Sequence, residues 1–222
     1  MKILIVLAHP ESKSMNGAMF DKAVDTLRGE GHEVRVSDLY REGFDPVSGR
    51  GNFKETYNAA YFKQQLEEAH ASGTGGFSEE IEAEQQKVEW CDLMIWQFPL
   101  WWFSVPGILK GWVDRVFAME RFYGNARFYE TGVFTGRKAI LSLTTGSPGE
   151  RYLKNGLQGD LYGMLKPVHR GILRFVGFDV LRPHVVYGPV RMTPEQRALE
   201  LAVWSERLKG IFSEEPIAVG TY

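Results

Sequence analysis

Three short stretches of the chain hold most of the side chains that could do chemistry. They read HPESKSMNG at 9–17, QFPLWWFS at 97–104 and TTGSPGERY at 144–152. The first and third carry imidazole, amide and hydroxyl groups, which can donate hydrogen bonds to anionic oxygens. The second carries three adjacent large rings, Trp101, Trp102 and Phe103. Together the stretches could hold a molecule that has both a phosphate group and a flat apolar ring.

Alternating strands and helices must position these stretches. Apolar runs predict strands at 3–8, 33–39, 93–96, 139–143 and 180–187. Apolar residues at helical spacing predict helices at 16–28, 54–70, 78–89, 105–117, 161–176 and 193–212. The alternation predicts one α/β domain over 1–222, a doubly wound five-stranded parallel sheet with helices on both faces. Residues 43–80 form a long, insertion-like connection in it.

Local signals predict where some helices begin. Ser78 would cap the helix at 78–89, and Ser104 would cap the helix at 105–117, with Pro106 in its first turn. The run Thr-Pro-Glu-Gln from Thr193 predicts a capping box at the last helix. Pro167 should break the helix at 161–176.

The strand order places the three chemical stretches together. A sheet of order 2-1-3-4-5 binds ligands beyond the carboxyl ends of its strands, at the point where the order reverses. The loops after the first, third and fourth strands meet there, and these loops are 9–17, 97–104 and 144–152. We therefore expect one ligand site at this edge of the sheet.

Each stretch can also be explained without a ligand. Ser14 or Asn16 would then cap a helix, 144–152 would be a tight turn, and the rings of 97–104 would be core. Three adjacent rings cannot all point inward, however. The first stretch also lacks the glycine patterns of dinucleotide and P-loop sites. Phosphate donors beside a flat wall favour a flavin nucleotide, with a nucleoside monophosphate or NAD(P) site left open.

Bulk properties exclude several classes of partner. The net charge is −2 and the sequence pI is near 6.2, which removes the electrostatic reason to expect nucleic acid or an anionic membrane. Neither a signal peptide nor an apolar run of spanning length is present in the sequence. The one cysteine, Cys91, should be a buried, inert thiol in a reducing compartment. We expect a cytoplasmic protein.

Along nearly its whole length the chain resembles the NAD(P)H:quinone oxidoreductases of the DT-diaphorase type, with 43–80 diverging most. The resemblance is carried by LIVLAH (4–9), SDLY (37–40), AEQQKVE (83–89), FPLWWFSVPGILKGW (98–112), RVF (115–117), LTTG (143–146), GILRFVGF (171–178) and EEPI (214–217). It implies a flavodoxin-like fold and a homodimeric FAD enzyme whose active site lies at the subunit interface.

The resemblance also implies roles for individual residues. Cofactor contacts would come from His9, Ser14, Met15, Asn16, Gln64, Pro99, Leu100, Trp101, Trp102, Phe103, Thr144, Thr145, Gly146, Ser147, Tyr152, Arg197 and Leu201. The acceptor pocket would use Trp102, Phe103, Tyr123, Asn125, Phe128, Gly171 and Phe175, some of them from the second subunit. Tyr152 and Gln158 would be the catalytic pair that stabilises negative charge on the reduced flavin.

Several positions depart from the family pattern. Gln158 stands where the best-known members have His, and it can donate a hydrogen bond but cannot deliver a proton. Asn125 replaces one of two acceptor-site tyrosines, which makes the pocket more polar. Arg170 and Arg174 replace two His that bind zinc in some members, so we predict no metal. The other histidines, His32, His70, His169 and His184, show no ligand spacing.

The function that the resemblance implies is a ping-pong, two-electron reaction. Hydride would pass from NADH or NADPH through FAD to quinones or similar electron-poor aromatics. An FMN-dependent azo- or nitroreductase and a redox-sensing regulatory subunit of a transporter are the alternatives. Larger members have a C-terminal extension that helps hold the NAD(P) adenine end. This sequence stops soon after EEPI, which leaves a smaller nicotinamide donor open.

Overall fold

A computed structural model describes residues 1–221. The fold is built around one parallel sheet. Its strands are β1 (Lys2–Leu7), β2 (Glu33–Asp38), β3 (Leu93–Pro99), β4 (Lys138–Thr145), β5 (Asp179–Val180) and β6 (His184–Tyr187). The order is β2-β1-β3-β4-β5, with β6 also paired to β4, and every pairing is parallel. The predicted strand order is therefore confirmed.

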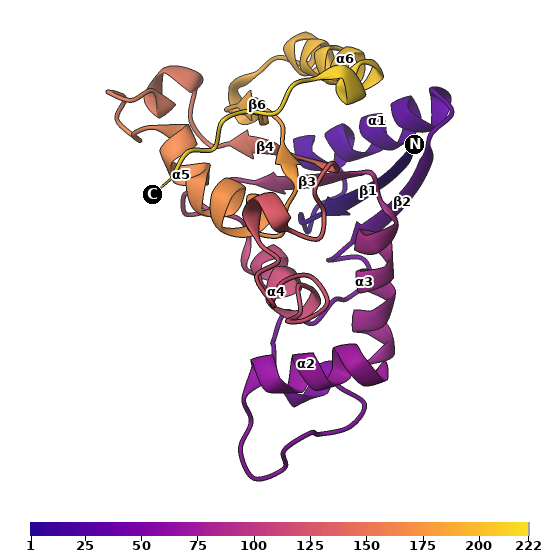
Figure 1. The fold of residues 1–222 in the computed structure, drawn as a ribbon. Helices are drawn as coiled ribbons and strands as arrows, with labels where there is room; N and C mark the ends of the chain where they lie inside the picture. Colours follow the sequence, from indigo (N-terminus) through magenta and orange to yellow (C-terminus); the bar gives the residue numbers. More distant parts are fainter. Residues whose placement is uncertain (222) are drawn as a thin grey trace.

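Helices cover both faces of this sheet, as Figure 1 shows. On one face lie α1 (Met15–Gly29) and α6 (Pro194–Lys209). On the other lie α3 (Glu79–Trp90), α4 (Gly107–Val116) and α5 (Leu161–Val168), while α2 (Gln64–Thr74) lies beyond them, farthest from the sheet. Within residues 1–221, no helix has both the length and the apolar character needed to cross a bilayer.

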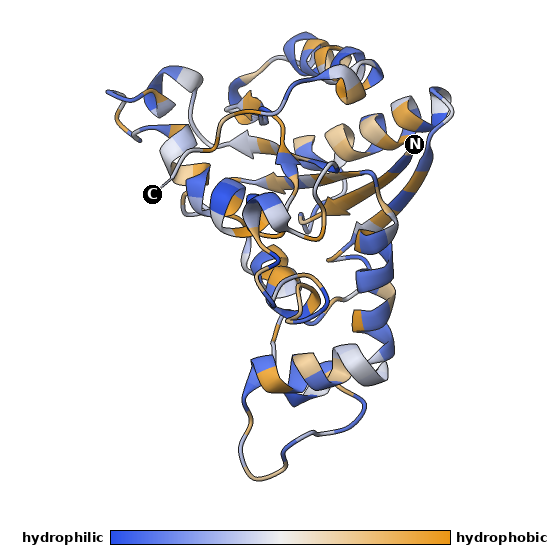
Figure 2. Cartoon of the chain, in the orientation of Figure 1, coloured by the Kyte–Doolittle hydropathy of each residue, from blue (hydrophilic) through white to orange (hydrophobic). Residues whose placement is uncertain are grey.

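The core consists of two apolar layers, one on each face of the sheet. Ile3 and Ile5 of β1 pack in the layer that contains Trp204 of α6, whereas Leu4 and Val6 pack in the layer that contains Trp112 of α4. Successive side chains of a strand point to opposite faces. A strand covered on both faces therefore needs a continuous apolar run, and Figure 2 shows the central strands as the most hydrophobic part of the chain.

The fifth strand is broken where the sequence predicts one continuous strand over 180–187. β5 pairs with Lys138 and Ala139 of β4, and β6 pairs with the residues from Ser142 to Thr145. Pro183 lies between the two segments. Proline has no N–H to give to the ladder, so the pairing lapses there and resumes one residue later.

The helix predicted at 54–70 is wrong in its first half, because α2 begins only at Gln64. Side chains bind the backbone of the preceding residues instead. The Glu67 carboxylate accepts from the N–H groups of Tyr57 and Asn58 at 2.6 and 2.9 Å. The Asn58 side chain accepts from the N–H groups of Ala60 and Tyr61 at 3.0 and 3.1 Å. Such bonds compete with helix formation.

The predicted capping residues of the helices are confirmed only in part. Thr193 and Gln196 form the predicted capping box of α6. Ser78 occupies the N-cap position of α3, but its side chain makes no capping bond. The prediction for Ser104 is wrong, since Pro106 occupies the N-cap position of α4. Just after Pro167, α5 gives way to a π-helix at His169–Arg174.

Arg115 of α4 ties the long connection at 43–63 to the rest of the fold. Its guanidinium is buried and donates to Asn52 Oδ1 at 2.8 Å, to the Asp45 carbonyl at 2.5 Å and to Glu80 at 2.8 Å. The backbone of the connection also approaches closely here, because a Cβ at Gly111 would lie 2.3 Å from the Pro46 carbonyl oxygen. The connection therefore packs directly on α4.

Replacing Arg115 should weaken the packing of the connection 43–63 on α4. We expect Arg115→Met to lower the free energy of unfolding by about 2–4 kcal/mol, because buried acceptors lose their donor. Lys110→Met on the same helix is the control. Lys110 also pairs with a carboxylate, Asp114 at 2.6 Å, but both side chains are about half exposed, so the loss should stay below about 1 kcal/mol. Equal losses in urea denaturation would contradict this role.

Candidate functional site

A buried chain of hydrogen bonds joins the three loops at the carboxyl edge of the sheet. Gln97 of β3 donates from Nε2 to Asn16 Oδ1 at 2.8 Å, and Asn16 of α1 donates from Nδ2 to Thr144 Oγ1 at 2.9 Å. Each of these three side chains is less than a tenth exposed. The structure therefore brings the end of the first predicted stretch together with the starts of the other two, and it fixes them through side-chain amides.

The start of α1 offers hydrogen-bond donors at this edge. Ser14 caps the helix by accepting from the Gly17 N–H at 3.1 Å. The first N–H groups of a helix lack partners within it, and they point toward its N-terminal end. Beside them, His9 Nδ1 accepts from the Glu11 N–H at 3.0 Å. The same nitrogen lies 3.1 Å from the Glu11 carbonyl oxygen. Burial lowers the pKa of His9, which favours the neutral ring, and Nε2 takes no part in these contacts.

The second loop forms a wall of exposed rings. Trp101, Trp102 and Phe103 are 41%, 94% and 47% exposed, so none of them is core. Trp102 and Phe103 have φ of 50° and 59°, a region that costs a non-glycine residue roughly 1–3 kcal/mol. Pro99 and Leu100 below them are buried, and the Leu100 N–H donates to the Thr144 carbonyl at 2.8 Å. The wall is thus strained, and β4 supports it.

The third loop is folded back by polar contacts. Thr145 Oγ1 donates to the Ser147 carbonyl at 2.7 Å, and Arg191 donates to the Gly146 carbonyl at 2.5 Å. Arg191 was missed by the sequence analysis, because only the fold brings it to this loop.

Tyr152 and Gln158 lie within this same folded segment. Tyr152 is buried, with its ring centre 5.9 Å from that of Tyr187. The Gln158 N–H donates to the Arg151 carbonyl at 2.8 Å, which brings the two members of the predicted catalytic pair to one loop.

The two predicted residues of α6 lie on the side of the sheet that α1 covers. Leu201 packs on the same apolar layer as Met15. Arg197 donates to the carbonyls of Met192 and Pro189 at 2.6 and 3.4 Å, so its guanidinium is partly engaged by its own loop. The two predicted contacts at the far end of the cofactor thus lie on the helix that shares this face of the sheet with α1.

A second group of predicted residues surrounds a separate cavity of about 290 Å³. Tyr123, Gly171 and Phe175 line this cavity together with residues of α4. The Phe175 ring is 5.8 Å from the rings of Tyr123 and Phe128, and it is stacked on the latter. Asn125 donates to Glu120 at 2.6 Å. We call Tyr123, Asn125, Phe128, Gly171 and Phe175 the acceptor group.

Gln64 lies with the acceptor group and away from the three loops. Its Nε2 donates to the Asp114 carbonyl at 2.9 Å and to Glu68 at 2.8 Å. In the described part of the chain, no hydrogen bond or ring contact joins the acceptor group or Gln64 to the three loops. Within one chain, the predicted site residues therefore form two groups that no such contact links.

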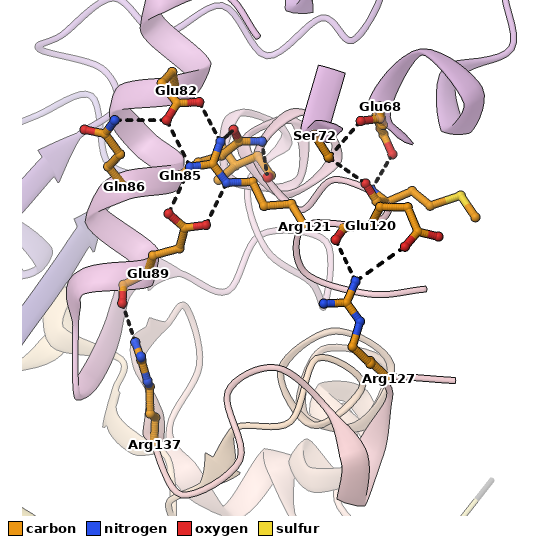
Figure 3. Close-up of polar contacts among 12 residues, drawn as sticks. Glu68, Ser72, Glu82, Gln85, Gln86, Glu89, Glu120, Arg121, Arg127 and Arg137 are labelled. Atoms are coloured by element: carbon orange, nitrogen blue, oxygen red, sulfur yellow. Dashed lines mark hydrogen bonds and ion pairs between the residues drawn. The ribbon is translucent and has the colours of Figure 1, made fainter. Parts of the chain in front are cut away.

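Three members of the acceptor group, Tyr123, Asn125 and Phe128, lie on a strained segment that Arg121 anchors. Four non-glycine residues between 120 and 129 have positive φ: Glu120, Asn125, Ala126 and Tyr129. Arg121 forms ion pairs with Glu82 and Glu89 of α3 at 2.5 and 2.7 Å, and it also donates to Gln85. Figure 3 shows this guanidinium between the acidic side chains of α3. Sequence reasoning missed Arg121, whose partners are more than thirty positions away along the chain.

Arg170 and Arg174 make polar contacts of their own. Arg170 donates to the Gly220 carbonyl at 2.7 Å and lies 4.4 Å over the Tyr129 ring. Arg174 pairs with Asp179 at 3.0 Å. Among residues 1–221, no cluster of three or more His, Cys, Asp or Glu side chains is placed to hold a metal ion.

Two buried histidines and the buried cysteine are inert at neutral pH. Burial lowers the pKa of His169 and of His184 to about 4, so both rings are neutral. Burial raises the pKa of the Cys91 thiol to about 12, so this cysteine is a protonated core residue, as the sequence predicts.

Comparisons with known proteins agree with this architecture. The family model of the flavodoxin-like fold matches residues 1–208. The chain is 44% identical to ribosyldihydronicotinamide dehydrogenase [quinone] of Rattus norvegicus, over 97% of this chain and 94% of that protein. It is 42% identical to NAD(P)H dehydrogenase [quinone] 1 of the same species, over 97% and 79%. The crystal structure of a candidate quinone reductase from Klebsiella pneumoniae superposes with a TM-score of 0.91 at 37% identity, covering 98% and 87%.

Removing the central amide should destabilise the edge of the sheet. We expect Asn16→Ala to lower the free energy of unfolding by about 1–3 kcal/mol, because Gln97 and Thr144 would keep buried polar atoms without partners. Asn155→Ala is the control, since Asn155 is exposed and surface changes stay within about 0.5 kcal/mol. Equal stabilities of the two variants in urea, without added ligand, would show that the amide chain does not hold the loops.

Proposed function

The chain belongs to the flavodoxin-like family of the NAD(P)H:quinone oxidoreductases, and from this premise we propose that it passes two electrons from a reduced nicotinamide to a quinone through a bound flavin. The observation that carries the proposal is the exposed, strained wall of Trp101, Trp102 and Phe103 beside the donors at the start of α1. A flat ring system that carries a phosphate chain needs both features at once.

The residues at this edge fit a flavin nucleotide. His9 Nε2–H, the first N–H groups of α1 and the hydroxyl of Ser14 would bind the phosphates. The loop 144–147 would follow the polar edge of the ring system, and Trp101 to Phe103 its flat face. When bound, the flavin supplies the hydride chemistry that protein side chains lack.

FAD is the form of flavin that we propose. Leu201 packs against the apolar layer that also holds Met15 of α1, and Arg197 lies one turn earlier on α6. They would serve an adenosine end, which FMN does not have. This contact beyond the phosphates favours FAD over FMN.

Tyr152 and Gln158 would stabilise negative charge at the polar edge of the flavin. The Tyr152 hydroxyl and the Gln158 amide can each donate a hydrogen bond to a developing anion. Tyr152 is buried, and a hydrogen bond to a charge is stronger away from water. Gln158 holds charge without transferring a proton, because an amide does not titrate.

We also propose that the enzyme works as a homodimer. The cofactor residues and the acceptor group lie in separate parts of one chain, so a second copy would have to supply the acceptor group to each flavin. The exposed rings support this, since Trp102 leaves 94% of its surface uncovered. Exposed apolar patches of this kind commonly mark interfaces. Each active site would then contain residues of both copies.

The first test is of flavin content and quinone turnover. We expect purified protein to be yellow or to become so with FAD, and to reduce a quinone with a dihydronicotinamide donor. The double variant Trp102→Ala, Tyr152→Phe should lose roughly 10²-fold in kcat/KM, the scale for removing one charge-stabilising donor. Val47→Ala, an exposed site, should keep full activity. A colourless protein that neither flavin reconstitutes, or unchanged turnover in the double variant, would contradict the proposal.

The same preparation separates the alternatives. Denaturing the protein and identifying the released flavin distinguishes FAD from FMN, and FMN would favour an azo- or nitroreductase. Rates with NADH, NADPH and a ribosyl dihydronicotinamide, measured against one quinone, identify the donor. Flavin binding with negligible turnover for every donor would favour a regulatory subunit.

A further inference from the structure

A buried carboxyl lies behind the acceptor group. Glu68 of α2 is 2% exposed, and its oxygens accept from Gln64 Nε2 and from the Met119 N–H, both at 2.8 Å. In Figure 3, Glu68 lies above Glu120 and Arg127. In the described part of the chain Glu68 forms no ion pair. A buried carboxyl without a cation favours its protonated form.

Tyr123 connects this carboxyl to the acceptor cavity. Its hydroxyl donates toward Glu68 Oε2 across 3.4 Å, a contact that must shorten for a proton to pass, because O–H···O hydrogen bonds span about 2.5–3.0 Å. The same side chain lines the cavity of about 290 Å³, across from Gly171 and Phe175. The Tyr123 side chain thus lies between the Glu68 carboxyl and the acceptor cavity.

The proposed reaction needs a proton at that cavity. A quinone becomes a hydroquinone when it gains one hydride and one proton. Gln158 at the cofactor edge cannot provide the proton, because an amide does not titrate. Asn125 within the acceptor group is an amide as well. Tyr152 would hold charge at the flavin edge, so the titratable hydroxyl that lines the acceptor cavity itself is that of Tyr123.

We propose that Glu68 is the proton reservoir for acceptor reduction and that it acts through the Tyr123 hydroxyl. This inference rests on the proposed function, which supplies the hydride. Tyr123 touches the acceptor and is the catalytic acid, whereas Glu68 acts through it as a positioning and proton-holding residue.

The proton transfers balance. The O–H bond of Tyr123 breaks as the new O–H bond of the hydroquinone forms. The O–H bond of the Glu68 carboxyl breaks as that of Tyr123 is restored. Glu68 is left as a carboxylate and regains its proton from water. The acceptor gains one hydride and one proton, and no other reductant or acid is consumed.

The surroundings of Glu68 favour its protonated form. Burial raises its pKa most, and the Asp114 carboxylate of α4 raises it further, while the bonds from Met119, Gln64 and Tyr123 lower it. The net direction is upward. Burial raises the pKa of Tyr123, and the Glu68 carboxylate raises it further once Glu68 has ionised.

The remaining charges near Glu68 are engaged elsewhere. Lys110 of α4 is paired with Asp114 at 2.6 Å. On α2, Glu67 binds the N–H groups of Tyr57 and Asn58 and lies 4.0 Å from Arg50. Lys110 and Glu67 thus bind partners other than Glu68, so neither competes with Tyr123 for the proton of Glu68.

The direct test follows the acceptor half of the reaction in the holoenzyme. Enzyme reduced by its donor is mixed with excess quinone, without oxygen, from about pH 5 to pH 9. The rate should fall as pH rises through the pKa of Glu68, because the acid form is required. Glu68→Gln should lower the rate at least tenfold at neutral pH, at the lower end of general acid contributions of about 10²–10⁴. It should also abolish this pH dependence.

Glu67→Gln is the matched control. Glu67 is the neighbouring carboxyl on the same helix and equally buried, but it has no contact with Tyr123. We expect this variant to keep the pH profile of the parent enzyme. A parent-like profile and rate in Glu68→Gln would overturn the inference.

A second readout needs no cofactor. The ultraviolet absorbance of ionised tyrosine, compared with and without Tyr123→Phe, isolates the titration of Tyr123 in the flavin-free protein. In Glu68→Gln the pKa of Tyr123 should fall, because a neutral amide replaces the carboxylate beside it. An unchanged Tyr123 pKa would show that the two groups are not coupled and would overturn the inference.

The failures of the two proposals are distinguishable. If the donor does not bleach the flavin of the parent enzyme, the proposed function fails and this inference with it. If the donor bleaches the flavin normally in the parent and in Glu68→Gln, but acceptor reduction has the same pH dependence in both, only the role of Glu68 fails.

Discussion

The hydrogen-bond chain from Gln97 through Asn16 to Thr144 is the interaction on which the rest of the candidate site depends. It joins the ends of β3 and β4 to the start of α1, and all three side chains are buried. Parallel strands bring their carboxyl ends to one edge but do not fix the loops that follow. The amide chain does so, and the helix donors and the ring wall consequently face the same space.

Two segments of the site are held in backbone conformations that non-glycine residues avoid. One is Trp102–Phe103, and the other includes Glu120, Asn125 and Tyr129. Each such residue costs roughly 1–3 kcal/mol, which the surrounding contacts must offset. For the second segment the offset comes from the Arg121 ion pairs with α3 and from the Met119 N–H bond to Glu68. Strained backbone thus occurs in the ring wall and in the acceptor group, the two parts of the site that the proposed reaction uses.

The strands and their order were predictable because a strand buried on both faces needs a continuous apolar run, as in 3–8. The three loops followed from that order. What failed depended on contacts that the sequence does not display. The helix predicted at 54–70 was lost to Glu67 and Asn58, which bind backbone groups several positions away. The sequence analysis assigned no role to Arg121 or Glu68, and only the packing of α2, α3 and α4 reveals their partners.

The central claim is that each active site combines the ring wall of one chain with the acceptor group of another. Mixed dimers test it directly. One chain carries Trp102→Ala and Tyr152→Phe, its differently tagged partner carries Tyr123→Phe and Phe175→Ala, and both homodimers are impaired. If the sites are shared, one site of the mixed dimer holds every substitution and the other holds none, so quinone turnover returns to about half that of the unsubstituted dimer. Turnover no higher than in the impaired homodimers would mean that each chain builds its own site, and would contradict the account.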